Sequence, residues 1–168
     1  MKTSVKKIAA LSCAFAAFGL FAAADCGSCR AKDKTRNAKA AKCEKRIWTE
    51  DIEAAFKTAA AEKKRVFIDF TGSDWCYWCI LADRNIFSTK EWADFSSKMV
   101  CLKVDFPSKT KPDAAVMAKR RAFAKEFGVR GYPTFVLASP ERNEIARFSA
   151  GKKSAAQFIA EVEKALSR

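Results

Sequence analysis

Two cysteines separated by two residues, Cys76 and Cys79, are the side chains of this chain best suited to chemistry. A run of β-branched and aromatic residues at 66–70 precedes them and breaks at the Gly- and Ser-containing segment 71–74, an order typical of strand, tight turn and helix. A cysteine at a helix start lies among unpaired backbone N–H groups, which favour the thiolate. The second cysteine then faces the same side and can resolve a mixed disulfide. The spacing predicts a dithiol redox site; a structural disulfide and half of a metal site are the alternatives.

Two segments resemble the thioredoxin superfamily. The letters D-F-T-G-S-D-W-C-Y-W-C at 69–79 are similar to its active-site segment, and most of all to that of exported thioredoxin-like proteins with a W-C-x-W-C site. The letters F-G-V-R-G-Y-P-T-F-V at 127–136 are similar to the segment that holds a cis proline against the active-site sulfurs. The resemblance covers roughly 48–168. It implies an α/β thioredoxin fold, with a central mixed sheet flanked by helices on both faces, over residues 47–168.

The residues and the resemblance together suggest roles. Cys76 is expected to be the attacking thiolate and Cys79 the resolving thiol, because only the first stands at the helix start. The resemblance implies that Pro133 is the cis proline and that Asp69 is a buried carboxylate that takes a proton from Cys79. Burial would raise the pKa of this carboxylate toward neutrality, as suits a base. Asp69 lies one residue further from the first cysteine than in thioredoxin, and the alternative is an aspartate that bonds turn amides.

Aromatic residues surround the predicted site and are expected to bind substrate: Trp75, Tyr77, Trp78 and Tyr132. No cation stands between the two cysteines, whereas disulfide isomerases have a histidine there that stabilises the thiolate. Ile80 follows Cys79 where thioredoxin has a basic residue. Both features favour a reductase with a moderately stabilised thiolate.

The first 24 residues predict a secretory signal peptide. They have a basic start, an apolar run and small residues before Asp25, where cleavage is expected. A membrane anchor is the alternative, but the apolar run of about sixteen residues is short for a span. We therefore expect an exported protein of the bacterial periplasm, or a secreted one, without a stable membrane span after cleavage.

Residues 25–46 form a basic arm that contains cysteines and almost no large apolar residue, so a flexible, solvated segment is predicted. Cys26 and Cys29 form a second C-x-x-C pair that no strand precedes. Three interpretations stay open for this pair: a small terminal disulfide, a second redox pair, or a thiolate metal site that also uses Cys43.

The periodicity beyond residue 47 predicts the elements that position the site. We expect a helix capped by Thr49, the site helix, a helix begun by a Ser88-x-x-Glu91 capping box, and a strand at 99–106 that contains Cys101 as a core residue. A helix from Pro112 to Phe127 should turn Val116 inward. A hairpin at 134–149 and a last helix capped by Ser154 and Gln157 complete the chain.

The composition excludes several kinds of chemistry. The 168 residues carry a net charge of +13 and seven cysteines but no histidine, so proton transfer must use carboxylates, thiols, lysines or water. The function expected is an exported, monomeric protein-disulfide reductase. Its partners would be disulfide-bearing proteins and a thiol electron donor, without nucleic acid, metal or cofactor. The alternatives are a disulfide isomerase or oxidase, a cysteine-based copper(I) protein, and a redox-inert adhesion module.

Overall fold

The computed structural model describes residues 48–168; the predicted signal peptide, the basic arm and the Cys26–Cys29 pair lie outside them. The described elements follow one another along the chain in this order: β1 (Trp48–Thr49), α2 (Ile52–Glu62), β2 (Val66–Thr71), α3 (Tyr77–Ala82), the π-helical turn η1 (Asp83–Phe87), α4 (Lys90–Ser96), β3 (Val100–Asp105), α5 (Ala114–Glu126), β4 (Thr134–Ala138), β5 (Glu144–Phe148) and α6 (Ala155–Leu166). No helix among these residues is long and apolar enough to cross a membrane.

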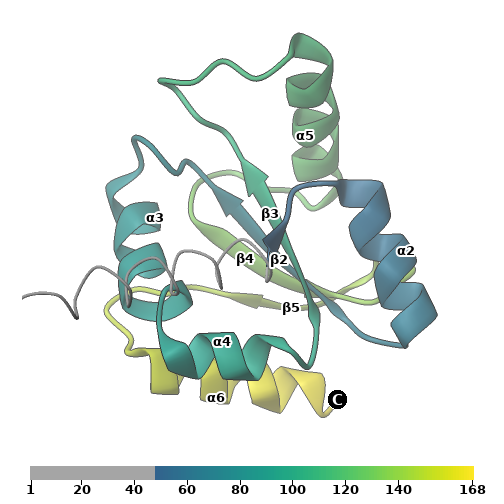
Figure 1. Cartoon of the computed structure of the whole chain (residues 1–168), viewed down its shortest axis with the longest axis vertical. Helices are drawn as coiled ribbons and strands as arrows, with labels where there is room; N and C mark the ends of the chain where they lie inside the picture. The colour runs from purple at the N-terminus through teal and green to yellow at the C-terminus, as the bar shows by residue number, and fades with distance from the viewer. Residues whose placement is uncertain (1–47) are drawn as a thin grey trace, which may run out of the picture. The chain divides into compact units, whose positions relative to one another are not determined.

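A mixed sheet with the order β1-β3-β2-β4-β5 forms the centre of the domain. Strands β1, β3 and β2 are parallel, whereas β4 pairs antiparallel with both β2 and β5. Helices α2 and α5 cover one face of this sheet and α3, α4 and α6 cover the other (Figure 1). The expected fold class is confirmed, and β1 is a short strand that the sequence pattern did not reveal.

Strand β2 is buried along its whole length and separates two apolar clusters. Successive side chains of a strand point to opposite faces. Phe67 accordingly packs with η1, α4 and α6, whereas Ile68 and Phe70 pack with α2 and α5. Asp69 and Thr71 have the parity of Phe67, so the strand directs Asp69 toward the layer that contains the cysteine helix.

Two helix starts differ from those predicted. Asp51, not Thr49, caps α2 by accepting the N–H of Ala54, because Thr49 is held in β1 opposite Leu102. Thr89, not Ser88, caps α4 through the N–H of Trp92. The N–H of Ser88 closes η1 by donating to the carbonyl of Asp83, so the turn ends one residue later than the letters suggested.

The remaining elements agree with the sequence pattern except at the start of α5. This helix begins at Ala114 with Asp113 as its cap, and Val116 is 40 % exposed instead of inward. Phe123 and Ala124, further along the helix, are buried. The hairpin is present as β4 and β5, and α6 begins with the predicted capping box of Ser154 and Gln157.

Candidate active site

Cys76 and Cys79 form a disulfide at the start of α3, with their Cα atoms 5.2 Å apart. Cys76 is the N-cap of this helix, and its Sγ accepts the backbone N–H of Cys79 over 3.2 Å. After reduction the same N–H would stabilise a thiolate on Cys76. The relative exposure is 7 % for Cys76 and 3 % for Cys79, so the first sulfur belongs to the more accessible residue of the pair.

The turn before the disulfide is held against the segment that follows β3. The carboxylate of Asp105 accepts both the backbone N–H and the hydroxyl of Ser73, at 2.9 and 2.6 Å. In return, the carboxylate of Asp74 accepts the backbone N–H groups of Ser108 and Lys109, at 2.8 and 2.6 Å. These four hydrogen bonds connect two loops that lie more than thirty residues apart in the sequence, and they fix the approach to Cys76.

Trp75 completes this connection. Its indole N–H donates to the carbonyl of Phe106 over 2.7 Å. A Cβ atom on Gly72 would lie 2.5 Å from the Trp75 ring, so glycine leaves the space that the ring occupies. Each letter of the G-S-D-W segment therefore has a physical role here. The sequence alone did not show these roles, because the acceptors Asp105 and Phe106 lie at the end of β3 and directly after it, more than thirty residues further along the chain.

The predicted aromatic rim exists as two pairs. Trp75 packs edge-on against Tyr132 with ring centroids 6.0 Å apart, and Tyr77 packs edge-on against Trp78 at 5.3 Å. Trp75, Tyr77 and Trp78 are each at least half exposed. The structure thus brings Tyr132 next to the site, together with Pro133, whose bond to Tyr132 is cis. These exposed rings beside a disulfide offer apolar surface to a partner chain.

Asp69 is buried, with a relative exposure of 3 %, and its Oδ1 has no hydrogen-bond partner among the described residues. It does not bond turn amides; Asp74 and Asp105 do so instead. Burial raises the pKa of Asp69 to about 7, although the charge of Lys103 opposes the rise. A carboxyl group with this pKa can gain and lose a proton near neutral pH.

Lys103 is a site residue that the sequence analysis did not single out. It lies directly opposite Asp69 in the register of β2 and β3, and its Nζ is 3.4 Å from the carboxylate of Asp83 on η1. Leu102 and Val104 on either side of it are buried, and a lysine between two apolar strand residues was the available signal. Lys103 links the buried Asp69 to the half-exposed Asp83.

Cys101 is a buried, free thiol on β3, as predicted. Burial and the charge of Asp69 raise its pKa to about 12, so it should remain an unreactive thiol in the folded protein. Across residues 48–168, no group of three or more cysteine or carboxylate side chains is arranged to hold a metal ion. The proposed metal site at Cys26, Cys29 and Cys43 lies outside this range.

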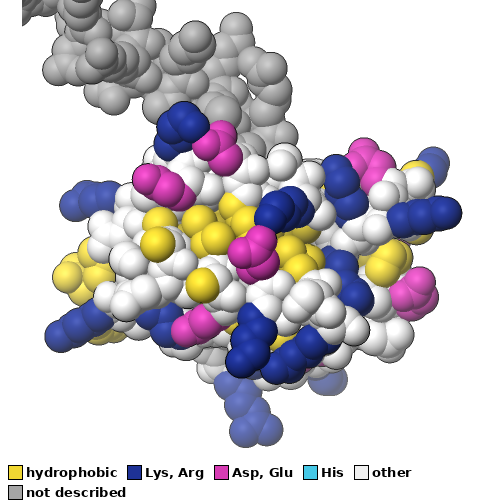
Figure 2. Space-filling model, turned by 90° about the horizontal axis from the view of Figure 1, so that it is seen from below, with side chains coloured by type: hydrophobic (Ala, Val, Ile, Leu, Met, Phe, Trp, Pro, Cys, Tyr) yellow, Lys and Arg dark blue, Asp and Glu magenta, His cyan; other side chains and the backbone are white. Residues whose placement is uncertain are grey.

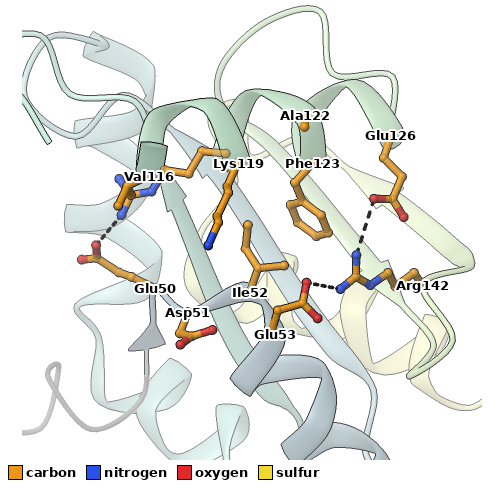
Figure 3. A pocket seen from close by; sticks show the side chains of 11 residues that line it. Glu50, Asp51, Ile52, Glu53, Val116, Lys119, Ala122, Phe123, Glu126 and Arg142 are labelled. Carbon is orange, nitrogen blue, oxygen red and sulfur yellow. Dashed lines mark hydrogen bonds and ion pairs between the residues drawn. The ribbon is translucent and has the colours of Figure 1, made fainter. Parts of the chain in front are cut away.

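A pocket of about 730 Å³ lies between α5 and the start of α2, and no predicted site residue lines it (Figure 3). Its charged groups largely neutralise one another. Arg120, only 7 % exposed, pairs with Glu50 at 2.7 Å and donates to the carbonyl of Asp105. Arg142 pairs with Glu53 at 2.6 Å. The interactions of this pocket tie helices to the sheet, and we assign it no role in the redox site.

The chain is similar to known redox proteins. It is 28 % identical over 118 residues to the disulfide bond reductase DsbH of Chlamydia pneumoniae, an alignment that spans 70 % of this chain and 71 % of the relative. The solved structure of DsbH oxidoreductase superposes with a TM-score of 0.68 at 27 % identity, covering 71 % of this chain and 83 % of that one.

More distant structures share the fold alone. A thioredoxin from Thermus thermophilus superposes with a TM-score of 0.53 at 20 % identity, over 70 % of this chain and 84 % of that chain. The family model for the thioredoxin-like domain matches residues 52–166, which contain the disulfide and the cis proline. The chain therefore belongs to the thioredoxin-like family and is a thiol–disulfide oxidoreductase.

Proposed function

We propose that this protein reduces disulfides in other exported proteins through Cys76 and Cys79. The observation that carries the proposal is the cap of α3, where the more accessible cysteine accepts a backbone N–H through its sulfur. Such a bond favours the thiolate, the form that attacks a disulfide. The similarity to a disulfide bond reductase of Chlamydia pneumoniae supports the same direction of reaction.

The reaction begins with the reduced dithiol. The Cys76 thiolate attacks one sulfur of the client, which breaks the client disulfide and releases one client thiolate. Asp69 then accepts the proton of the Cys79 thiol, and Cys79 attacks the Cys76 sulfur to release the second client thiolate. Two electrons pass to the client, and the disulfide seen in the structure remains. A thiol protein must restore the dithiol by the reverse exchange.

The aromatic rim and the cis-proline segment receive the client in this scheme. Trp75 and Tyr132 pack together beside the sulfurs, and Pro133 follows Tyr132 directly. Proline has no backbone N–H, so Pro133 itself can offer a client chain only its carbonyl group, next to the exposed rings. Thiol–disulfide exchange of this kind proceeds by thiolate attack alone, without a cofactor.

The direction of the reaction depends on the reduction potential. No histidine stands between the cysteines, and the Cys76 sulfur has the N–H of Cys79 as its only hydrogen-bond donor among the described residues. A moderately stabilised thiolate gives a reducing pair. We expect a reduction potential near that of thioredoxin, roughly −270 mV. Equilibration of the protein with glutathione measures it. A potential above about −180 mV, the range of disulfide isomerase, would favour the oxidase or isomerase alternative.

Cysteine substitutions test the roles. Cys76→Ser should abolish reduction of insulin, whereas Cys79→Ser should still attack and should accumulate mixed disulfides with clients. In the reduced native protein iodoacetamide should label Cys76 before Cys79. Cys101 is the internal control, since its buried thiol should be labelled only after unfolding. Wild-type turnover in Cys76→Ser, or earlier labelling of Cys79, would move the site to the Cys26–Cys29 pair.

Export is part of the proposal and is tested separately. The small residues at 22–24 and the charged segment that follows predict a mature protein that begins at Asp25. The intact mass of protein recovered from the periplasm or culture medium should correspond to residues 25–168. A mass that retains the first 24 residues would indicate an anchored protein.

Replacing Cys26 and Cys29 together by serine should leave reduction of a small model disulfide largely unchanged.

A further inference from the structure

A small pocket of about 330 Å³ borders the aromatic rim. One wall consists of Phe106 and Tyr132, whose rings stack with centroids 5.0 Å apart. Tyr132 also contacts Trp75, the neighbour of Cys76 in the sequence, and it precedes the cis proline. A client whose disulfide reaches Cys76 therefore extends its flanking residues over this pocket.

The other wall is basic. Arg121, Lys125 and Arg130 line the pocket and no acidic residue does so. Within residues 48–168 none of these three side chains forms an ion pair, whereas the nearby Arg120 and Arg142 each pair with a glutamate. The face formed by α4 and α6 looks different, because basic and acidic side chains are mixed there (Figure 2). Three basic side chains without an ion pair in the described part of the chain thus line one pocket next to the aromatic rim.

Tyr132 adds a hydrogen-bond donor to this basic wall. Its ring contacts Trp75 and Phe106 and packs against the apolar cluster below α5, while its hydroxyl forms no hydrogen bond with another residue of 48–168. Burial raises the pKa of Tyr132, and the charge of Arg121 offsets only part of the rise. The phenol is therefore protonated at neutral pH and can donate a hydrogen bond to an anion.

We propose that this pocket binds a carboxylate of the client, an aspartate or glutamate side chain within a few residues of the reacting cysteine. The inference rests on the proposed reductase function and narrows its substrates to disulfides in acidic sequence. Arginine and lysine recognise carboxylates by charge-assisted hydrogen bonds, and positive charge around a cleft speeds the encounter with negative partners. The pocket has room for one side chain and offers it three cations and the hydroxyl of Tyr132.

Two synthetic disulfide peptides test the inference. They are identical except that glutamates flank the cysteine in one and lysines in the other, and kcat/KM for their reduction is measured with the full reduced protein. We expect the acidic peptide to be preferred by about tenfold at low ionic strength. The preference should shrink at high salt, because the Debye length falls to about 3 Å at 1 M.

A pair of matched variants locates the effect. Arg121→Glu combined with Arg130→Glu should abolish or reverse the preference. Lys57→Glu combined with Lys164→Glu changes the net charge equally on α2 and α6, away from the pocket, and should preserve it. Because lost positive charge also disfavours the Cys76 thiolate for every substrate, the ratio of the two rates is the quantity compared.

The outcomes separate this inference from the function on which it rests. Equal rates for both peptides with the wild-type protein would overturn the acidic-client inference and leave the reductase function standing. A preference that survives in the Arg121 and Arg130 variant would place the recognition elsewhere and overturn the pocket's role. Failure to reduce either peptide would contradict the reductase function, and the inference with it.

Discussion

At the scale of single residues, Asp69 is a carboxylate that the fold removes almost completely from water. It is fully enclosed, and one carboxylate oxygen has no partner among the described residues. Desolvation disfavours the charged form, so the folded protein retains the proton to about pH 7, whereas an unfolded chain loses it near 3.8. Asp69 therefore destabilises the fold at neutral pH, and a catalytic role would account for such a residue.

Asp69→Asn should stabilise the oxidised protein above pH 7. Between the unfolded pKa of 3.8 and the folded pKa of about 7, the native state binds more protons than the unfolded state, so Asp69 lowers stability as pH rises. The shift corresponds to on the order of 4 kcal/mol at most. Urea unfolding should show a gap between variant and wild type that grows from pH 4 to 7 and is constant above.

Asp83→Asn is the matched control, since it removes a partly exposed carboxylate next to Lys103 and leaves Asp69 in place. A gap for Asp69→Asn that does not change between pH 4 and 8 would show that the folded and unfolded pKa values are alike.

The same substitution should slow the release of clients. Without the Asp69 carboxylate, the proposed acceptor for the proton of Cys79 is lost, and we expect turnover at pH 7 to fall by about a hundredfold, the lower range for a general base. The loss should diminish as pH approaches the roughly 8.5 of a free thiol, because Cys79 then ionises unaided. Turnover measured from pH 6 to 9 checks this. A loss equal at every pH would indicate a structural effect of the substitution.

The sequence was informative about residues that act through their own chemistry and silent about those that act through partners. Motif and spacing singled out the two cysteines, Pro133 and Asp69, and the structure shows a disulfide, a cis bond and a buried carboxylate at these positions. Lys103 and Asp105 were missed, because each interacts with a residue that is distant in the sequence. The register of β2 with β3 places Lys103 opposite Asp69, and Asp105 accepts a hydrogen bond from Ser73 in the turn after β2.

At the scale of elements, Arg120 connects α5 to the end of β3 next to the active-site turn. Its Nη1 donates to the carbonyl of Asp105, the residue whose carboxylate holds Ser73, and its Nη2 pairs with Glu50. The arginine is buried but the Glu50 side chain is 64 % exposed. If Arg120 is removed, water can therefore solvate the carboxylate of Glu50, but it cannot reach the carbonyl of Asp105 in the same way.

Arg120→Met should destabilise the protein by about 1–3 kcal/mol, because the carbonyl of Asp105 loses the buried guanidinium that donates to it. Glu50→Gln removes only the exposed side of the ion pair and should cost about 0–1 kcal/mol. Lys119 lines the same pocket and has no ion pair among the described residues. Lys119→Met should therefore change the free energy of unfolding by no more than about 0.5 kcal/mol. Chemical unfolding of the three variants checks this order, and equal costs for Arg120→Met and Glu50→Gln would contradict it.

Element boundaries were the least predictable part of the fold. Thr49 and Ser88 are good caps by residue type, but β1 pairing and the closure of η1 use these positions, and the next suitable residues, Asp51 and Thr89, cap instead. Val116 has the periodicity of a core residue, yet it faces the pocket between α2 and α5. The differences at Thr49 and Val116 arise from tertiary contacts that no local pattern contains, and the difference at Ser88 arises from the closure of η1.

At the scale of the whole molecule, residues 48–168 contribute an apolar cluster to each face of the sheet. One contains Phe67, Trp92 and Phe158, and the other contains Phe70 and Phe123. The mixed sheet, the chain order of β2 to β5 and the two helical layers were predicted from hydrophobic periodicity and from the resemblance, because burial of large side chains supplies most of the folding free energy. The basic arm at 25–46 offers almost nothing apolar to such clusters.

A chain that begins at Ile47 should therefore fold without the preceding residues. We expect its free energy of unfolding to lie within about 0.5 kcal/mol of that of the protein that begins at Asp25, since changes that bury no apolar surface have small effects. Urea unfolding of both forms, in the oxidised state and followed by tryptophan fluorescence, provides the measurement. Reduction of a small model disulfide should also be unchanged, because Cys76 and Cys79 are both retained. A loss of several kcal/mol would show that residues 25–46 pack on the domain, and a selective loss of activity would indicate that Cys26 and Cys29 relay electrons to the Cys76 pair.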